Sequence, residues 1–143
     1  MSDCCYLELT VRSDDAGRAV ESLGEPDTQT PEGLTAVTLV YESANYGMNL
    51  ALTELASRGV EFVGWHSSGS AFNPTKFYTR GRVLYYLAMG HDNFGYVIFG
   101  SDAQERRNSL ADVEARVEAR ESLRSAIMNP LYDMAKHDDL SPR

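Results

Sequence analysis

The densest group of potentially reactive side chains lies at residues 66–75, where a serine-rich segment follows an apolar run. His66 or His91 could serve as a base and Ser67 or Ser68 as a nucleophile, and hydrolysis requires the two within hydrogen-bond distance of each other. The spacing does not favour that chemistry, because residues 64–69 do not match Gly-x-Ser-x-Gly and no helix pattern follows them. We therefore predict no catalytic residue. The alternative for these serines is a turn that hydrogen-bonds to its own backbone.

A small-ligand site or a hydrolase site is the second interpretation of the same segment. Backbone amides of a serine- and glycine-rich run can bind an anion, nearby arginines supply positive charge, and aromatic rings supply stacking surfaces. No Gly-x-Gly-x-x-Gly or Walker pattern is present, so a nucleotide is not indicated. The residues of this alternative site are His66, Ser67, Ser68, Ser70, Tyr78, Arg82 and His91.

Metal ligands are few and scattered. The three histidines are His66, His91 and His137, and the sequence has neither His-Glu-x-x-His nor Cys-x-x-Cys. The two cysteines, Cys4 and Cys5, are adjacent, so alternation along a strand would place one thiol inside and one outside. We expect reduced thiols, no metal site and no cofactor.

The charge balance is the clearest global signal. The chain has 21 acids and 13 bases, a net charge of −8. Residues 1–75 hold eleven acids and three bases, whereas residues 76–143 hold ten of each, so the whole excess falls in the first half. This balance argues against direct binding to nucleic acid or to an anionic membrane, because both require a basic face.

An acidic half is compatible with a basic protein partner, since complementary charge speeds and selects association. The alternative is that these acids only solvate loops and helix starts. We assign the contact with the partner to five of them: Asp14, Asp15, Glu25, Asp27 and Glu32.

The elements that must position these groups follow from hydrophobic periodicity. Residues 4–12 alternate, with Cys5, Leu7, Leu9 and Val11 on one side and Tyr6, Glu8, Thr10 and Arg12 on the other. Residues 25–33 are predicted as an exposed loop, residues 43–45 as a helix cap, and Ser101 as the cap of the last helix. The predicted strands are 4–12, 34–42, 60–65, 76–79, 82–89 and 94–99, and the predicted helices are 16–23, 46–58 and 101–128.

This order predicts an α+β fold with one mixed or mainly antiparallel sheet. A strand-helix-strand-helix unit is followed by a meander, and a ferredoxin-like arrangement is one candidate. We expect a single domain over residues 1–128, including the long helix, and a C-terminal tail at 129–143. The strands at 82–99 are apolar on both sides, so either the long helix or another subunit must cover their second face.

The long helix carries only a thin apolar stripe, with Leu110, Val113 and Val117 among mostly charged residues. We therefore expect a homodimer with this helix or the sheet face at its interface. No secretory leader pattern and no run of about 18 apolar residues occurs, so we expect a cytoplasmic protein without a membrane partner.

Together these patterns favour a non-enzymatic protein-binding domain. By size and charge alone, it compares with small acidic inhibitors and immunity proteins that act on a basic nuclease or a nucleic-acid-binding protein. The alternative remains a small-ligand-binding protein or hydrolase with its site at residues 66–78.

Overall fold

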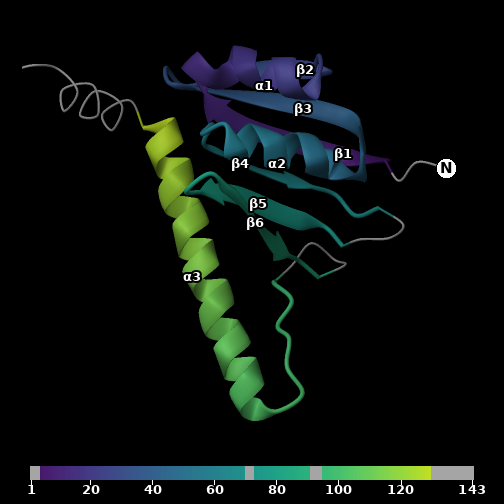
Figure 1. Cartoon of the computed structure of the whole chain (residues 1–143), viewed down its shortest axis with the longest axis vertical. Helices are drawn as coiled ribbons and strands as arrows, with labels where there is room; N and C mark the ends of the chain where they lie inside the picture. The colour runs from purple at the N-terminus through teal and green to yellow at the C-terminus, as the bar shows by residue number, and fades with distance from the viewer. Residues whose placement is uncertain (1–3, 70–72, 91–94, 130–143) are drawn as a thin grey trace, which may run out of the picture.

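One six-stranded sheet with helices on both faces forms the fold (Figure 1). The computed structural model describes residues 4–69, 73–90 and 95–129. The strands run in the order β2-β3-β1-β4-β5-β6, and every neighbouring pair is antiparallel. They are β1 (Cys4–Arg12), β2 (Thr28–Glu32), β3 (Ala36–Asn45), β4 (Phe62–His66), β5 (Thr75–Arg80) and β6 (Val83–Ala88). The helices are α1 (Ala16–Leu23), α2 (Asn49–Ser57) and α3 (Ala103–Met128), with short 3-10 turns at Ser13–Asp15 and Tyr46–Met48.

Two strand-helix-strand units interlock in this sheet. The first unit runs from β1 through α1 to β2, and β3 lies between its two strands. The second unit runs from β3 through α2 to β4, and β1 lies between its two strands. This is the ferredoxin-like arrangement, extended beyond β4 by the β5–β6 hairpin. The predicted α+β class, the antiparallel sheet and the long C-terminal helix are confirmed.

The first core lies between the sheet and the pair α1–α2. It takes the alternate residues of β1 that the sequence places on one side: Cys5, Leu7, Leu9 and Val11. Ala19 of α1 and Leu52 of α2 are buried in the same cluster. Cys5 is buried and Cys4 is exposed, as the alternation predicts, and neither cysteine is in a disulfide.

The second core lies on the opposite face, under α3. Val63, Tyr78 and Leu87 from three neighbouring strands pack with Ile127 of α3. Thr35 donates a hydrogen bond of 2.9 Å from its hydroxyl to the carbonyl oxygen of Ile127, which fixes the end of the helix on the sheet. The long helix α3 contacts this face of β6 (Figure 1).

The predicted loop at residues 25–33 is wrong, because β2 occupies Thr28–Glu32. Its sequence, TQTPE, has no apolar residue and contains Pro31, so neither alternation nor composition indicates a strand. β2 is an edge strand that pairs only with β3, where backbone hydrogen bonds are sufficient and a proline is tolerated.

Three other boundaries also differ from the prediction. β3 continues to Asn45 through the predicted cap at 43–45, and α2 begins only at Asn49. Of the predicted strand 94–99, residue 94 lies outside the described residues, and the others form only a single bridge from Tyr96 to Met89. The cap of α3 is Asp102, whose carboxylate accepts the Glu105 amide at 2.8 Å, one residue after the predicted Ser101.

Candidate functional site

His66 is a buried core side chain at the end of β4. It is 7% exposed, and its ring lies 6.3 Å from the ring of Phe77. Its Nδ1 lies 2.9 Å from the Ser67 carbonyl oxygen. Gly47 packs against the ring so closely that a Cβ there would lie 3.0 Å from Cδ2 of His66. The imidazole is therefore enclosed by packing rather than presented to a cleft.

Ser67 extends the pairing of β4 with β1. Its amide donates to the Tyr6 carbonyl oxygen at 2.9 Å, and its hydroxyl oxygen accepts the Tyr6 amide at 3.0 Å. Ser68 is exposed. The hydroxyl of Ser67 thus serves the backbone, as in the turn interpretation of these serines.

The other residues of the predicted ligand site do not gather around His66. Tyr78 lies on the opposite face of the sheet, in the core under α3, and Arg82 is exposed in the β5–β6 turn. Ser70 and His91 lie outside the described residues. The described members therefore form no common site, and the ligand interpretation stays a prediction.

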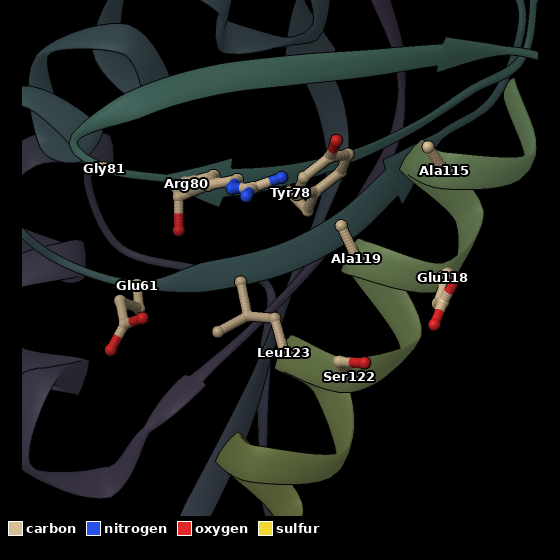
Figure 2. A pocket seen from close by; sticks show the side chains of 10 residues that line it. Glu61, Tyr78, Arg80, Gly81, Ala115, Glu118, Ala119, Ser122 and Leu123 are labelled. Atoms are coloured by element: carbon tan, nitrogen blue, oxygen red, sulfur yellow. The ribbon is translucent and has the colours of Figure 1, made fainter. Parts of the chain in front are cut away.

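A groove between α3 and the strand ends does border Tyr78 (Figure 2). It has a volume of about 470 Å³. Ala119 and Leu123 point from α3 toward the sheet, where Tyr78 and Arg80 lie on β5. Burial raises the pKa of Tyr78, so its phenol stays neutral and does not act as a base near neutral pH.

The five acids assigned to the partner contact fall at two ends of β2. Asp14 and Asp15 lie in the 3-10 turn that precedes α1. The Ser13 amide of this turn donates to the Thr35 carbonyl oxygen, which follows β2 by three residues, so Glu32 at the end of β2 lies near the turn. Glu25 and Asp27 precede β2 at its other end. The structure thus divides these acids between the two ends of one edge strand.

The acids at the second end continue onto the sheet. The Asp27 carboxylate accepts the Glu42 amide of β3 at 2.7 Å, and the Asp27 amide donates to the Val40 carbonyl oxygen at 2.8 Å. Glu42 is exposed and close enough to Tyr6 of β1 for its charge to affect that phenol. A row of acidic side chains therefore leads from β2 to β1.

At the end of that row, one carboxylate joins two aromatic side chains. Glu8 accepts the Tyr6 hydroxyl on Oε1 and the Trp65 indole on Oε2, each at 2.9 Å. The two rings lie 5.2 Å apart between centroids. Glu8 and Trp65 are direct cross-strand partners of β1 and β4, so their side chains leave the same face. We call Tyr6, Glu8 and Trp65 the aromatic–carboxylate cluster.

The aromatic–carboxylate cluster lies on the face of the sheet that α3 occupies, but away from the helix. Within the described residues, α3 crosses near the C-terminal end of β1, and no helix covers the N-terminal end where the cluster lies (Figure 1). All three side chains are partly exposed. Burial, then the hydrogen bond to Glu8, then the charges of Glu8 and Glu42 raise the pKa of Tyr6, so the phenol remains a donor.

A cation borders the aromatic–carboxylate cluster on its other side. Lys76 of β5 pairs with Trp65, and its ammonium donates to the Tyr96 hydroxyl at 3.2 Å. The same ammonium lies 5.5 Å from the centre of the Tyr96 ring. We call this part of the sheet face, which α3 does not cover, the open sheet face. It is acidic over β2, β3 and β1, and it carries the Lys76 ammonium at β5.

Sequence reasoning did not single out this cluster, although its signal was present. The alternation of residues 4–12 places Tyr6 and Glu8 together on the side opposite the core. Trp65 is 57 positions from Glu8, and only the register of β1 with β4 brings them together.

Three further observations concern metal binding, membrane spans and similarity to known proteins. Among the described residues, no group of three or more His, Cys, Asp and Glu side chains could hold a metal ion. None of the described helices is long and apolar enough to span a bilayer. Comparisons with protein-family models, with curated proteins and with solved structures gave no match to this chain.

Proposed function

We propose that this protein is a non-enzymatic binding domain that binds the basic surface of another protein through the open sheet face. The observation that carries the proposal is the aromatic–carboxylate cluster, in which Glu8 is held between Tyr6 and Trp65 on a partly exposed face. Tryptophan and tyrosine dominate the energetic centres of protein interfaces. An anchored carboxylate beside them supplies the group that a basic side chain recognises.

The chemistry of the aromatic–carboxylate cluster fits an arginine or lysine of the partner. A carboxylate offers about four acceptor positions, and the two hydrogen bonds to Glu8 leave positions for an incoming cation. A guanidinium can also lie over an indole or phenol ring, an arrangement that strengthens as water is excluded. Because Tyr6 and Trp65 already hold Glu8 in place, little side-chain freedom is lost on binding.

The surrounding acids would act mainly on the rate of association. Asp27 and Glu42 continue the negative surface from the cluster to the edge of the sheet, and Glu25 precedes them. Charges of this kind steer a basic partner, and salt screens them beyond about 8 Å at physiological ionic strength. Charge reversal at Glu25 and Asp27 should therefore lower the association rate more than it raises the dissociation rate.

The partner class that we propose is a nuclease or another nucleic-acid-binding protein. Such proteins carry basic surfaces for phosphate contacts, so an acidic domain that covers that surface would inhibit them. This proposal rests on charge and on the geometry of the cluster.

Affinity capture from the native host tests the proposal with matched baits. The wild-type chain should retain basic proteins that the variant Glu8→Gln/Trp65→Ala fails to retain. Glu54→Gln is the control for the loss of one charge, because Glu54 is exposed on α2 and paired with Arg58. If the double variant captures the same proteins as the wild type and Glu54→Gln, the open sheet face is not the binding surface.

A further inference from the structure

The first half of α3 and the chain leading into it form an arm that projects beyond the sheet (Figure 1). We define the arm as residues 95–114. None of residues 95–112 is buried. Contacts within the arm fix its shape: Asp102 caps the helix, Glu105 accepts the Ser101 amide at 2.7 Å, and the Phe99 amide donates to the Ser109 hydroxyl at 2.9 Å.

This shape exposes apolar side chains. Phe99 is 68% exposed, Leu110 is 45% exposed and Ile98 is 37% exposed. Leu110 and Ile98 border a groove of about 460 Å³ whose surface is mainly apolar. The groove is lined by Tyr96, Ile98, Leu110, Val113, Glu114, Val117 and Glu118. An exposed apolar groove with a polar rim is typical of a protein-interaction site.

The charged residues on the same side of the helix as Leu110 indicate which partner the groove binds. Arg106 and Arg107 precede Leu110 by four and three residues, and Glu114 follows it by four, so all lie on one side of the helix. The whole of α3 holds five acids and five bases, so it is neutral, unlike the acidic first half of the chain. A basic protein would be drawn to that acidic half rather than to this neutral surface.

A stripe with bases at its N-terminal end and acids at its C-terminal end is complementary to an antiparallel copy of itself. We propose that the groove of the arm binds the arm of a second copy of this chain, with the two-fold axis next to Leu110. Pairing centred between residues 110 and 111 places Arg107 opposite the partner subunit's Glu114, and symmetry repeats the contact. Leu110 and Phe99 would then be covered at the centre of the interface.

The dimensions of the arm suit such a contact. In the pairing centred between residues 110 and 111, residues 103–118 of the two helices lie opposite each other over about 24 Å, at about 1.5 Å per residue. Stable interfaces bury about 1,200–2,000 Å² in total, so the flanking chains at 95–102 must contribute to the contact besides the two helices. This inference is independent of the proposed function, because the arm does not include any residue of the aromatic–carboxylate cluster.

Sedimentation velocity of the full chain tests the proposal. The concentrations run from about 1 to 100 μM, an experimental range around typical dimer affinities. The wild type should sediment as a dimer at the upper concentrations. Leu110→Glu should weaken the dimer by at least about 100-fold, as expected for a residue at the centre of an interface. Circular dichroism of each variant confirms that α3 is still folded.

A charge exchange makes the test specific to the antiparallel register. Arg107→Glu and Glu114→Arg should each weaken the dimer by about 10-fold or more, because each creates two like-charge pairs. The double variant Arg107→Glu/Glu114→Arg should recover the wild-type dissociation constant within about threefold, because both pairs are restored with reversed signs. Asn108→Glu is the control, since Asn108 is exposed on the other side of the helix from Leu110.

Three results would overturn the proposal. They are a wild-type monomer at every concentration, a Leu110→Glu chain that dimerises like the wild type, and a double charge variant that stays as weak as its singles. If the chain stays a monomer and a different protein binds the arm, the first of these results is obtained and the proposal is overturned.

Discussion

Arg120 of α3 reaches through the second core to the backbone of the sheet, and its Nη2 lies 3.1 Å from the carbonyl oxygen of Gly64 in β4. Its Nε lies 3.3 Å from the carbonyl oxygen of Phe77, which is the cross-strand partner of Gly64 in β5. Arg120 is 7% exposed, and burial lowers the pKa of its guanidinium, although an arginine remains charged. The long helix is thus attached to two strands by charge-assisted hydrogen bonds.

Removing this attachment should destabilise the fold. Arg120→Ala removes a charged donor from two buried carbonyl oxygens and opens a space under α3, so we expect a loss of about 2–4 kcal/mol in the free energy of unfolding. Arg120→Met should lose less, since it keeps the apolar volume. Urea denaturation measures both, with Arg124→Met as an exposed control on the same helix. Equal stability of Arg120→Ala and Arg124→Met would contradict the attachment.

Gly64 is required by a close approach in the first core. A Cβ at this position would lie 2.3 Å from the Glu8 carbonyl oxygen and 2.6 Å from the Phe77 ring. Neither β1 nor a buried ring can move without disturbing its neighbours, so Gly64→Ala should cost about 1–3 kcal/mol or more.

The matched control for that substitution is Gly17→Ala. Gly17 lies in α1, and nothing lies within 4 Å of the position that a Cβ would take there. Alanine at this position should therefore stabilise the protein by about 0.5–1 kcal/mol. Thermal unfolding of the two variants should shift in opposite directions. A neutral Gly64→Ala would show that the strands tolerate the methyl group.

Tyr41 makes stability depend on alkaline pH. Its hydroxyl donates to the Gly24 carbonyl oxygen at 2.8 Å, and burial, followed by the charges of Glu25 and Asp27, raises its pKa to about 12. An unfolded tyrosine has a pKa of about 10. Between these values the unfolded chain has released the proton and the folded chain has kept it, so the free energy of unfolding falls as pH rises.

The variant Tyr41→Phe should remove that part of the fall. Urea denaturation at about pH 9 and pH 11 should show a smaller difference for Tyr41→Phe than for the wild type. The pKa values of Tyr6, Tyr78 and Tyr86 are also raised and act in the same direction, so part of the decline should remain in Tyr41→Phe. An unchanged pH dependence in Tyr41→Phe would refute the assignment.

Trp65 is the only tryptophan in the chain, so its fluorescence reports directly on the open sheet face. Titration with an octa-arginine peptide at low salt should change the emission of the wild type, because a guanidinium beside Glu8 would approach the indole that hydrogen-bonds to it. Glu8→Gln should weaken the apparent affinity more than Glu54→Gln, although each removes one negative charge. Equal weakening would indicate a response to net charge alone.

The sequence by itself determined the composition of each face. Alternation in β1 separates Leu7 and Leu9, which enter the core, from Tyr6 and Glu8, which do not, because successive side chains of a strand leave opposite faces. The 26-residue length of α3 and the acid excess of the first half are likewise properties of local sequence. The arm stripe around Leu110 follows from helical spacing in the same way.

Only the tertiary structure decided which of these groups meet. β2 exists because β3 offers it backbone partners, since TQTPE has no apolar pattern of its own. His66 and Tyr78, close in sequence, are separated by the sheet, whereas Glu8 and Trp65, distant in sequence, become direct neighbours. Strand register is set by the packing of the whole core, because a shift of one residue would turn every buried side chain to the wrong face.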